Sequence, residues 1–286
     1  MTSLYPIPSS ENAVPLQRTR GSARLSAKHS AGQSRIDRLF QEGSARIRLP
    51  KVAPGAPLEA VIINTAGGLT GGDHMDWQFE AGEGARMSLT TQACEKTYKA
   101  NGVTEARVTV GLKLQSASSI AWLPQETILF DRARLQRTID VDMAADARLL
   151  MVEPVVFGRL AMNEAVLQGL FRDRWRLRMD GRLLHAEETR IGPDVDADLN
   201  RAAIAAGGLA IATVVMIAPE AETRLDAVRQ IIGASGGASF VSPRGAQTGK
   251  LLARLVAKDS YELRQRLGPL IRLLNPDGGL PKVWST

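Results

Sequence analysis

Residues 61–76 read VIINTAGGLTGGDHMD, a β-branched apolar run followed by a loop with four glycines in six positions. β-Branched residues favour strands and glycine reaches positive φ without strain, so the pattern predicts a buried strand that ends in a sharp turn. Asp73, His74 and Asp76 follow the glycines, and divalent metals bind carboxylate oxygens and imidazole nitrogens. From these residues alone, the loop could serve a phosphate, a metal, catalysis or only the turn itself.

Similar strand patterns recur on both sides of this loop, separated by Gly, Pro or Asn. They cover residues 23–30, 45–49, 59–64, 77–79, 86–91, 106–114, 119–123, 138–143, 148–153, 171–179 and 209–218. Many short strands at this spacing are typical of a mainly β protein. The longest apolar run, residues 202–218, is split by Gly207-Gly208 and rich in Ala, so it predicts a buried strand and no membrane span.

Two α-helices are predicted in the C-terminal third of the chain, over residues 221–232 and 261–274, where apolar residues recur at helical spacing. Asp259 or Ser260 can cap the second helix, and Asn275-Pro276 ends it. We expect both apolar stripes to pack on the sheet core, with a partner-binding groove as the alternative.

Composition and charge are those of an ordinary globular protein. The chain has 286 residues, is 44% apolar and 23% charged, and carries a net charge of +6. Residues 1–50 hold eight basic and three acidic side chains, so most of the excess lies there. We predict a mobile tail over residues 1–20 and a single domain over residues 21–286.

One cysteine, Cys94, leaves no intramolecular disulfide, and the first residues show no secretory signal pattern. Both features predict the cytoplasm as the compartment. Cys94 is interpreted as a small buried side chain, because no histidine stands beside it as a base.

Motifs for common chemistries are missing from the sequence. The glycine loop does not have the spacing of a dinucleotide fingerprint, and residues 245–251 are one residue short of a phosphate-binding P-loop. The chain has three histidines and contains neither H-E-x-x-H nor a Cys-x-x-Cys pair, so a structural zinc site is disfavoured. An enzyme of unknown type is therefore the least favoured class.

Residues 171–179 alternate so that Arg172, Arg174, Arg176 and Arg178 share one face of a strand. This arginine row is either a solvated face paired with cross-strand acids such as Glu187 or Glu188, or a contact face for an acidic partner. Nucleic acid is disfavoured, since no aromatic stacking platform accompanies the row.

Several acids stand next to unusual backbone: Asp73, Asp76, Glu126, Asp131, Glu153 and Glu164. Together with His74 they could form a weak, exchangeable site for a hard or borderline divalent ion. The alternative is structural, with Asp73 capping a turn and Glu126 accepting hydrogen bonds from backbone amides.

Five segments of the chain resemble the UreD (UreH) family of urease accessory proteins. The segments are NTAGGLTGGD (64–73), TTQACEKTYK (90–99), WLPQETILFD (122–131), FGRLAMNE (157–164) and LPKVW (280–284). Their order and spacing match from about Gly21 to the C-terminus. The chain departs from the family pattern at Asn163, where Gly is usual, and at Lys99 and Lys282, where Arg is common.

The resemblance implies a stacked, β-helix-like arrangement of short strands plus two α-helices. It also implies a non-enzymatic maturation factor that binds the accessory proteins UreF and UreG and apo-urease, with no nucleic acid or membrane partner. Such a factor assists nickel insertion and holds no tightly bound cofactor, although nickel can bind transiently. Asp73, His74, Glu126 and Glu164 are the expected nickel-transfer residues, and a pure scaffold without nickel contact is the alternative.

Overall fold

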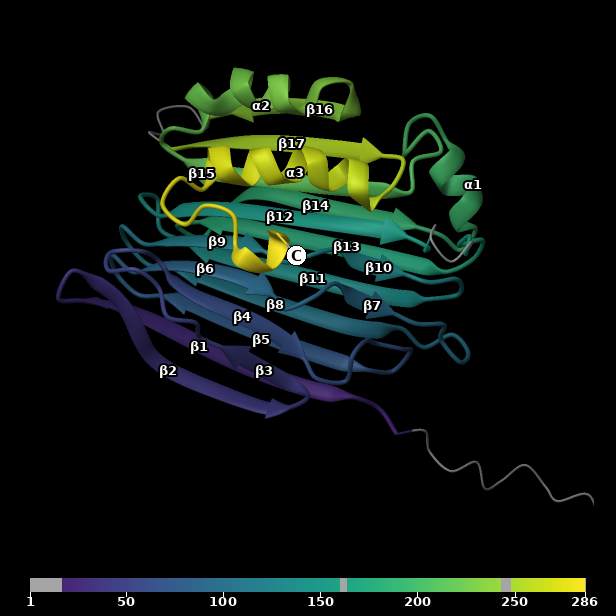
Figure 1. Cartoon of the computed structure of the whole chain (residues 1–286), viewed down its shortest axis with the longest axis horizontal. Coiled ribbons are helices and arrows are strands. Elements are labelled where there is room, and N and C mark those ends of the chain that lie inside the picture. The colour runs from purple at the N-terminus through teal and green to yellow at the C-terminus, as the bar shows by residue number, and fades with distance from the viewer. Residues whose placement is uncertain (1–16, 160–163, 243–247, 286) are drawn as a thin grey trace, which may run out of the picture.

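The computed structural model describes residues 17–159, 164–242 and 248–285 (Figure 1). Most of the predicted tail over residues 1–20, and Asn163, therefore lie outside the described residues. The chain is mainly β, and its strands stack in two sheets that face each other. The predicted β-helix-like class is thereby confirmed.

The seven-stranded sheet has the order β14-β13-β11-β8-β5-β1-β2. Its strands are β1 (Arg20–Ser30), β2 (Gln33–Gly43), β5 (His74–Ala81), β8 (Ala106–Leu114), β11 (Arg134–Met143), β13 (Leu170–Met179) and β14 (Arg182–Ile191). The five strands from β1 to β13 run parallel, while β2 and β14 are antiparallel at the two edges.

The ten-stranded sheet has the order β16-β17-β15-β12-β9-β6-β4-β3, with β10 paired to β12 and β7 paired to β10. Its strands are β3 (Ala45–Arg48), β4 (Leu58–Asn64), β6 (Arg86–Thr91), β7 (Glu95–Thr97), β9 (Ser119–Leu123), β10 (Thr127–Leu129), β12 (Arg148–Phe157), β15 (Ala210–Ala218), β16 (Gly236–Val241) and β17 (Gly249–Ala257). The strand β15 confirms the prediction for residues 209–218.

From β4 to β13 the chain passes back and forth between the sheets, and each coil adds parallel strands to both. The alternation of side chains follows from this arrangement, because each strand turns one face toward the other sheet. Trp77 and Phe79 of β5 and Leu89 of β6 are buried in the core between the sheets. The glycine loop is one of the connections that cross between sheets, from β4 to β5.

Two glycines of this loop are required by its geometry. Gly67 has φ +76°, a conformation that strains any residue with a side chain. A Cβ atom at Gly71 would lie 2.3 Å from the carbonyl oxygen of Thr104 in the next coil. The predicted sharp turn is therefore confirmed, and its compactness lets successive coils stack closely.

The helices α2 (Leu225–Ile232) and α3 (Ser260–Leu274) pack against the outer face of the ten-stranded sheet (Figure 1). Leu263 and Leu267 of α3 are buried in a second core with Val152 and Val214. Asp259 caps α3 by accepting a hydrogen bond from the Glu262 amide at 2.8 Å. The apolar stripes thus pack on the sheet, as expected.

A third, shorter helix, α1 (Val195–Asn200), follows β14 and was not predicted. The predicted helix start at residue 221 is instead a 3-10 turn, Glu222–Arg224, that leads into α2. In the part of the chain that is described, no helix combines the length and apolar character needed to cross a membrane.

Candidate functional site

A cavity of about 250 Å³ lies between the two sheets. Its apolar wall comes from both sheets and consists of Trp77, Val108, Val110, Trp122 and Leu135. The β4–β5 loop and the segment before β7 complete the lining through Asn64, Gly67 and residues 91–96. The motif segments 64–73, 90–99 and 122–131, far apart in sequence, therefore meet around one cavity.

A buried ion network forms the polar part of this wall. Arg137 of β11 donates from Nε and Nη2 to the two carboxylate oxygens of Asp173 on β13, at 3.0 and 2.5 Å. Its Nη1 donates to Glu153 on β12 and, at 3.3 Å, to Thr127 Oγ1. Trp122 Nε1 donates to Glu153 Oε1 at 2.6 Å. Arg137 thus ties the two sheets together across the core.

Burial shifts the pKa of Glu153 in this network, while Arg137 stays charged. Removal from water raises the pKa of Glu153 to about 7, although the positive charge of Arg137 opposes the shift. The two carboxylates raise the pKa of Arg137 in spite of its burial, so the guanidinium stays charged. Near neutral pH, Glu153 is therefore a buried group that can gain or lose a proton.

A second carboxylate, Glu95 of β7, lies in the cavity wall. Asn64 Nδ2 donates to its two oxygens at 3.2 and 3.3 Å. Burial raises the pKa of Glu95 to about 7, while the hydrogen bond from Asn64 acts in the opposite direction. The cavity consequently has two carboxyl groups that titrate near neutrality.

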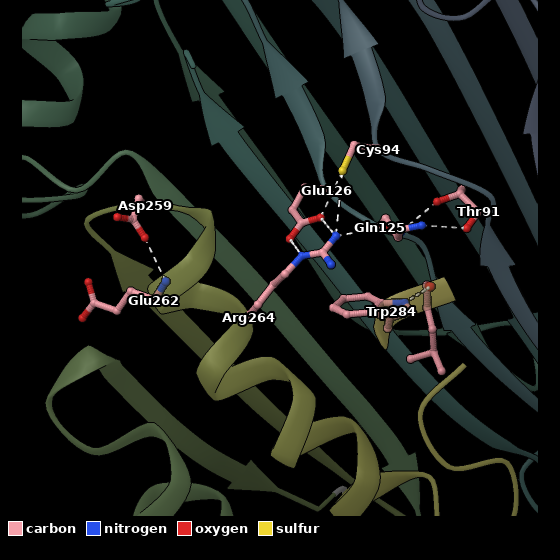
Figure 2. Close-up of polar contacts among 9 residues, drawn as sticks. Thr91, Cys94, Gln125, Glu126, Asp259, Glu262, Arg264 and Trp284 are labelled. Atoms are coloured by element: carbon pink, nitrogen blue, oxygen red, sulfur yellow. Dashed lines mark hydrogen bonds and ion pairs between the residues drawn. The ribbon is translucent and has the colours of Figure 1, made fainter. Parts of the chain in front are cut away.

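An ion pair joins α3 to Glu126 in the β9–β10 loop (Figure 2). Arg264 of α3 donates to the two oxygens of the buried Glu126 at 2.5 and 2.6 Å, and to Gln125 Oε1 at 2.9 Å. The Cys94 thiol lies 3.3 Å from Glu126 Oε2. Cys94 is half-buried among these polar groups, which corrects the prediction of a small buried apolar-like side chain.

The C-terminal segment contacts Arg264 through Trp284. The Arg264 guanidinium carbon lies over the Trp284 ring, 5.6 Å from the ring centroid (Figure 2). Trp284 Nε1 donates a hydrogen bond to the Leu123 carbonyl at 3.0 Å. Burial, and next the charge of Glu126, raise the pKa of Cys94 to about 11. The thiol is therefore protonated near neutral pH and is not an activated nucleophile.

A hollow of about 360 Å³ opens beside this contact. It shares four lining residues with the inter-sheet cavity: Gln92, Ala93, Cys94 and Gln125. These four residues, of which Gln92 and Ala93 are exposed, lie between the inter-sheet cavity and the hollow, and we call them the partition. We take the cavity, the partition and the Glu126–Arg264 contact as the candidate functional site.

Comparison with known proteins assigns this architecture to a family. The sequence model of the family described as UreD urease accessory protein matches residues 19–285. The chain belongs to the UreD family. Its UreD relative from Mesorhizobium japonicum is 55% identical over 276 residues, which cover 96% of this chain and 97% of the relative. The UreD protein of Brucella suis is 51% identical over 271 residues, or 95% and 96% of the two chains. UreD membership confirms the resemblance and supports a role in urease maturation.

Two residues of the predicted nickel-transfer set adjoin the glycine loop. Asp73 is buried and accepts hydrogen bonds from the backbone amides of Thr19 and Thr70, each at 2.8 Å. This carboxylate closes the turn and ties it to the segment before β1, as the structural alternative proposed. His74 is exposed at the start of β5.

The other two residues have arginine partners. Glu126 is bound by Arg264 and not by backbone amides, so that part of the structural alternative is wrong. Glu164 forms an ion pair with Arg159 at 2.6 Å. None of the four predicted residues lines the inter-sheet cavity, and only Glu126 lines the hollow beside it. Within residues 17–159, 164–242 and 248–285, no group of three or more His, Cys, Asp or Glu side chains is arranged to hold a metal ion.

The arginine row lies on the outer face of the seven-stranded sheet. Arg176 pairs with Glu188 at 3.5 Å, and Arg178 pairs with Asp140 at 3.8 Å. The expected pairing of the row with a cross-strand acid is therefore confirmed for Glu188, whereas the buried Glu187 carboxylate binds Arg254 at 2.6 Å instead.

Sequence reasoning missed Arg137, Asp173, Arg264 and Glu95 as parts of the site. Asp173 carried a usable signal, because it alternates with the buried Phe171 and Trp175 and so belongs to the inner face. A carboxylate at such a position requires a buried cation. Arg264 had no such signal, since its partner Glu126 is 138 residues away in the sequence.

Proposed function

We propose that this chain is a non-enzymatic maturation factor that binds apo-urease together with the accessory proteins UreF and UreG. In this role it assists the insertion of nickel into urease in the cytoplasm and holds no tightly bound cofactor. The observation that carries the proposal is the UreD match over residues 19–285, together with relatives named as urease accessory proteins that align over nearly their full lengths.

Nickel is the cargo in this proposal, and the inter-sheet cavity is its route. Glu95 and Glu153 support the route, because a carboxyl group with a pKa of about 7 exchanges its proton for a cation at little cost near neutral pH. Few oxygen ligands hold nickel weakly, which a transfer protein needs. Asp73, His74, Glu126 and Glu164 remain proposed transfer residues outside the cavity, with Glu126 closest to it across the partition.

A scaffold without nickel contact is the alternative, and one observation favours it. Asp73, Glu126 and Glu153 already have their oxygens bonded to protein groups. In that case these carboxylates maintain the shape of the chain, and the protein only holds its partners together.

Calorimetry with Ni²⁺ distinguishes the two functions. Wild type and Glu95→Gln/Glu153→Gln are titrated alone and as complexes with UreF. Saturable binding that weakens at least tenfold in the double variant supports the nickel route. Binding of UreF without any nickel signal supports the scaffold. Failure of the chain to bind UreF contradicts both functions.

A further inference from the structure

The outer face of the seven-stranded sheet carries most of its charge as arginine. On the neighbouring strands β8, β11, β13 and β14, the outward positions hold eight basic and three acidic side chains. The basic ones are Arg107, Lys113, Arg134, Arg172, Arg174, Arg176, Arg178 and Arg190, and the acidic ones are Asp140, Asp142 and Glu188. The helices α2 and α3 pack against the other sheet, so this face is turned to solvent.

Ion pairs divide the face into two ends. At the end where β11 and β13 finish, Arg176, Arg178 and Lys113 pair with Glu188, Asp140 and Glu80. Toward the opposite end, within the described residues, no ion pair involves the exposed Arg107, Arg172, Arg174 or Arg190. We call these four residues the arginine cluster. Two acids adjoin this end: Glu188, which lies opposite Arg174 in the register but pairs with Arg176, and Glu105, which pairs with Arg134.

Sheet register brings the cluster together. Arg172 on β13 lies opposite Arg190 on β14, and on its other side Gln136 separates it from Arg107 on β8. Neighbouring strands are about 4.8 Å apart, so Arg107 and Arg190 are separated by about 14 Å. Arg174 lies about 6.6 Å from Arg172 along the strand. Four unpaired guanidinium groups therefore occupy one flat, exposed area.

Like charges held this close repel one another, so the cluster gains stability when an anionic surface covers it. We propose that the arginine cluster is a docking surface for an acidic patch on a folded protein. The acids at the other end of the same face suit a partner of mixed, complementary charge, and they repel a uniform polyanion such as nucleic acid. Phe, Tyr and Trp are absent from the outward positions of β8, β11 and β13, so these strands offer no platform for base stacking.

This inference rests on the proposed function, because the acidic patch would belong to one of the proteins that the chain binds. The proposed docking surface differs from the predicted row of four arginines on β13. Arg176 and Arg178 are neutralised within the sheet, whereas Arg107 and Arg190, on other strands, join Arg172 and Arg174.

Charge reversal tests the docking surface. The test variant is Arg172→Glu/Arg190→Glu, and the matched control is Lys113→Glu/Arg178→Glu, which changes the same charge at the ion-paired end. Affinity for purified apo-urease, UreF and UreG is measured separately at 100 and 500 mM salt. All four side chains are outside the core, so both variants should keep the melting temperature within 2–3 °C of wild type, about the scatter expected for surface changes.

The expected result is at least a tenfold loss of affinity for one partner in the test variant and less than a threefold loss in the control. The difference should shrink at 500 mM salt, because the interaction is between exposed charges. Equal affinities of the two variants would overturn the docking surface while leaving the proposed function intact. If wild type bound none of the three proteins, the proposed function itself would fail. Tighter binding to a 20-base-pair DNA duplex, dependent on the same arginines, would overturn the assignment to a protein partner.

Discussion

Replacing Arg137 by Leu should destabilise the protein more than any exposed substitution. Arg137, Asp173 and Glu153 are only 3–5% exposed, and the substitution leaves two carboxyl groups in the core without their cation. Removing one partner of a buried ion pair costs about 3–5 kcal/mol. Because globular domains have about 5–15 kcal/mol of stability in total, the loss should be a large fraction of it.

The corresponding shift in melting temperature follows from the size of the chain. An unfolding entropy of about 2.1 cal/mol/K per residue gives about 0.6 kcal/mol/K for 286 residues. A loss of about 3–5 kcal/mol then lowers the melting temperature by about 5–8 °C. Urea unfolding followed by tryptophan fluorescence measures the free energy directly, since Trp122 and Trp175 are buried.

The loss should also depend on pH. The pKa of Glu153 is raised from its ordinary value of 4.5 to about 7, so between these values the folded state holds a proton that the unfolded state has released. The contribution of Glu153 to stability therefore falls as pH rises through this window. Without Arg137 the charged form of Glu153 loses its stabilising partner. We therefore expect Arg137→Leu to lower the free energy of unfolding more at pH 8 than at pH 5.5.

Arg178→Leu is the matched control, because Arg178 makes a solvent-exposed ion pair with Asp140. It should change stability by less than about 0.5 kcal/mol. A loss below about 1 kcal/mol for Arg137→Leu, equal at both pH values, would refute the buried network as a source of stability.

Three further changes probe the rest of the site. Arg264→Ala should lower the free energy of unfolding by about 2–4 kcal/mol, because it leaves the buried Glu126 without its cation. Arg264→Lys should lower it less, since lysine keeps the charge. Equal losses in the two variants would contradict the role of charge. Gly71→Ala should lower the melting temperature more than Gly67→Ala, since only the former meets a neighbouring carbonyl, and the reverse order would contradict the packing of the coils. Cys94 should react with a thiol reagent at pH 8 about tenfold more slowly than a thiol of pKa 9.0, because its pKa of about 11 lowers the thiolate fraction about a hundredfold, while the more basic thiolate is about tenfold more nucleophilic. Rapid labelling of the native protein would show that the thiol is not held as described.

Much of the β architecture was predictable because one-sided burial leaves an alternating pattern. The strand β13 reads directly from its alternation, and β4 from its β-branched run. In contrast, β2 is exposed on both faces along nearly all its length, so its sequence has no inward side to reveal. The strand β14 contains a bulge that shifts its register against β13 beyond Leu177, and the shift interrupts any regular pattern.

The candidate site was less predictable, because its contacts join residues that are distant in sequence. The segments that resemble the UreD family marked the right regions, and three of them meet at the cavity. The particular residues were harder to choose. Asp73, with its backbone partners, turned out to close a turn, whereas Glu95 gains its raised pKa only from the walls that other coils build around it. Burial of this kind depends on the order of parallel strands, which local sequence patterns do not encode.

The nickel content of urease tests the central proposal most directly. Urease is purified from cells that express it with UreF, UreG and either wild type, no copy of this chain, or Glu95→Gln/Glu153→Gln. We expect high nickel content with wild type, little without the chain, and a reduced content with the double variant, although that variant still co-purifies with its partners. Equal nickel content with and without the chain would contradict the account.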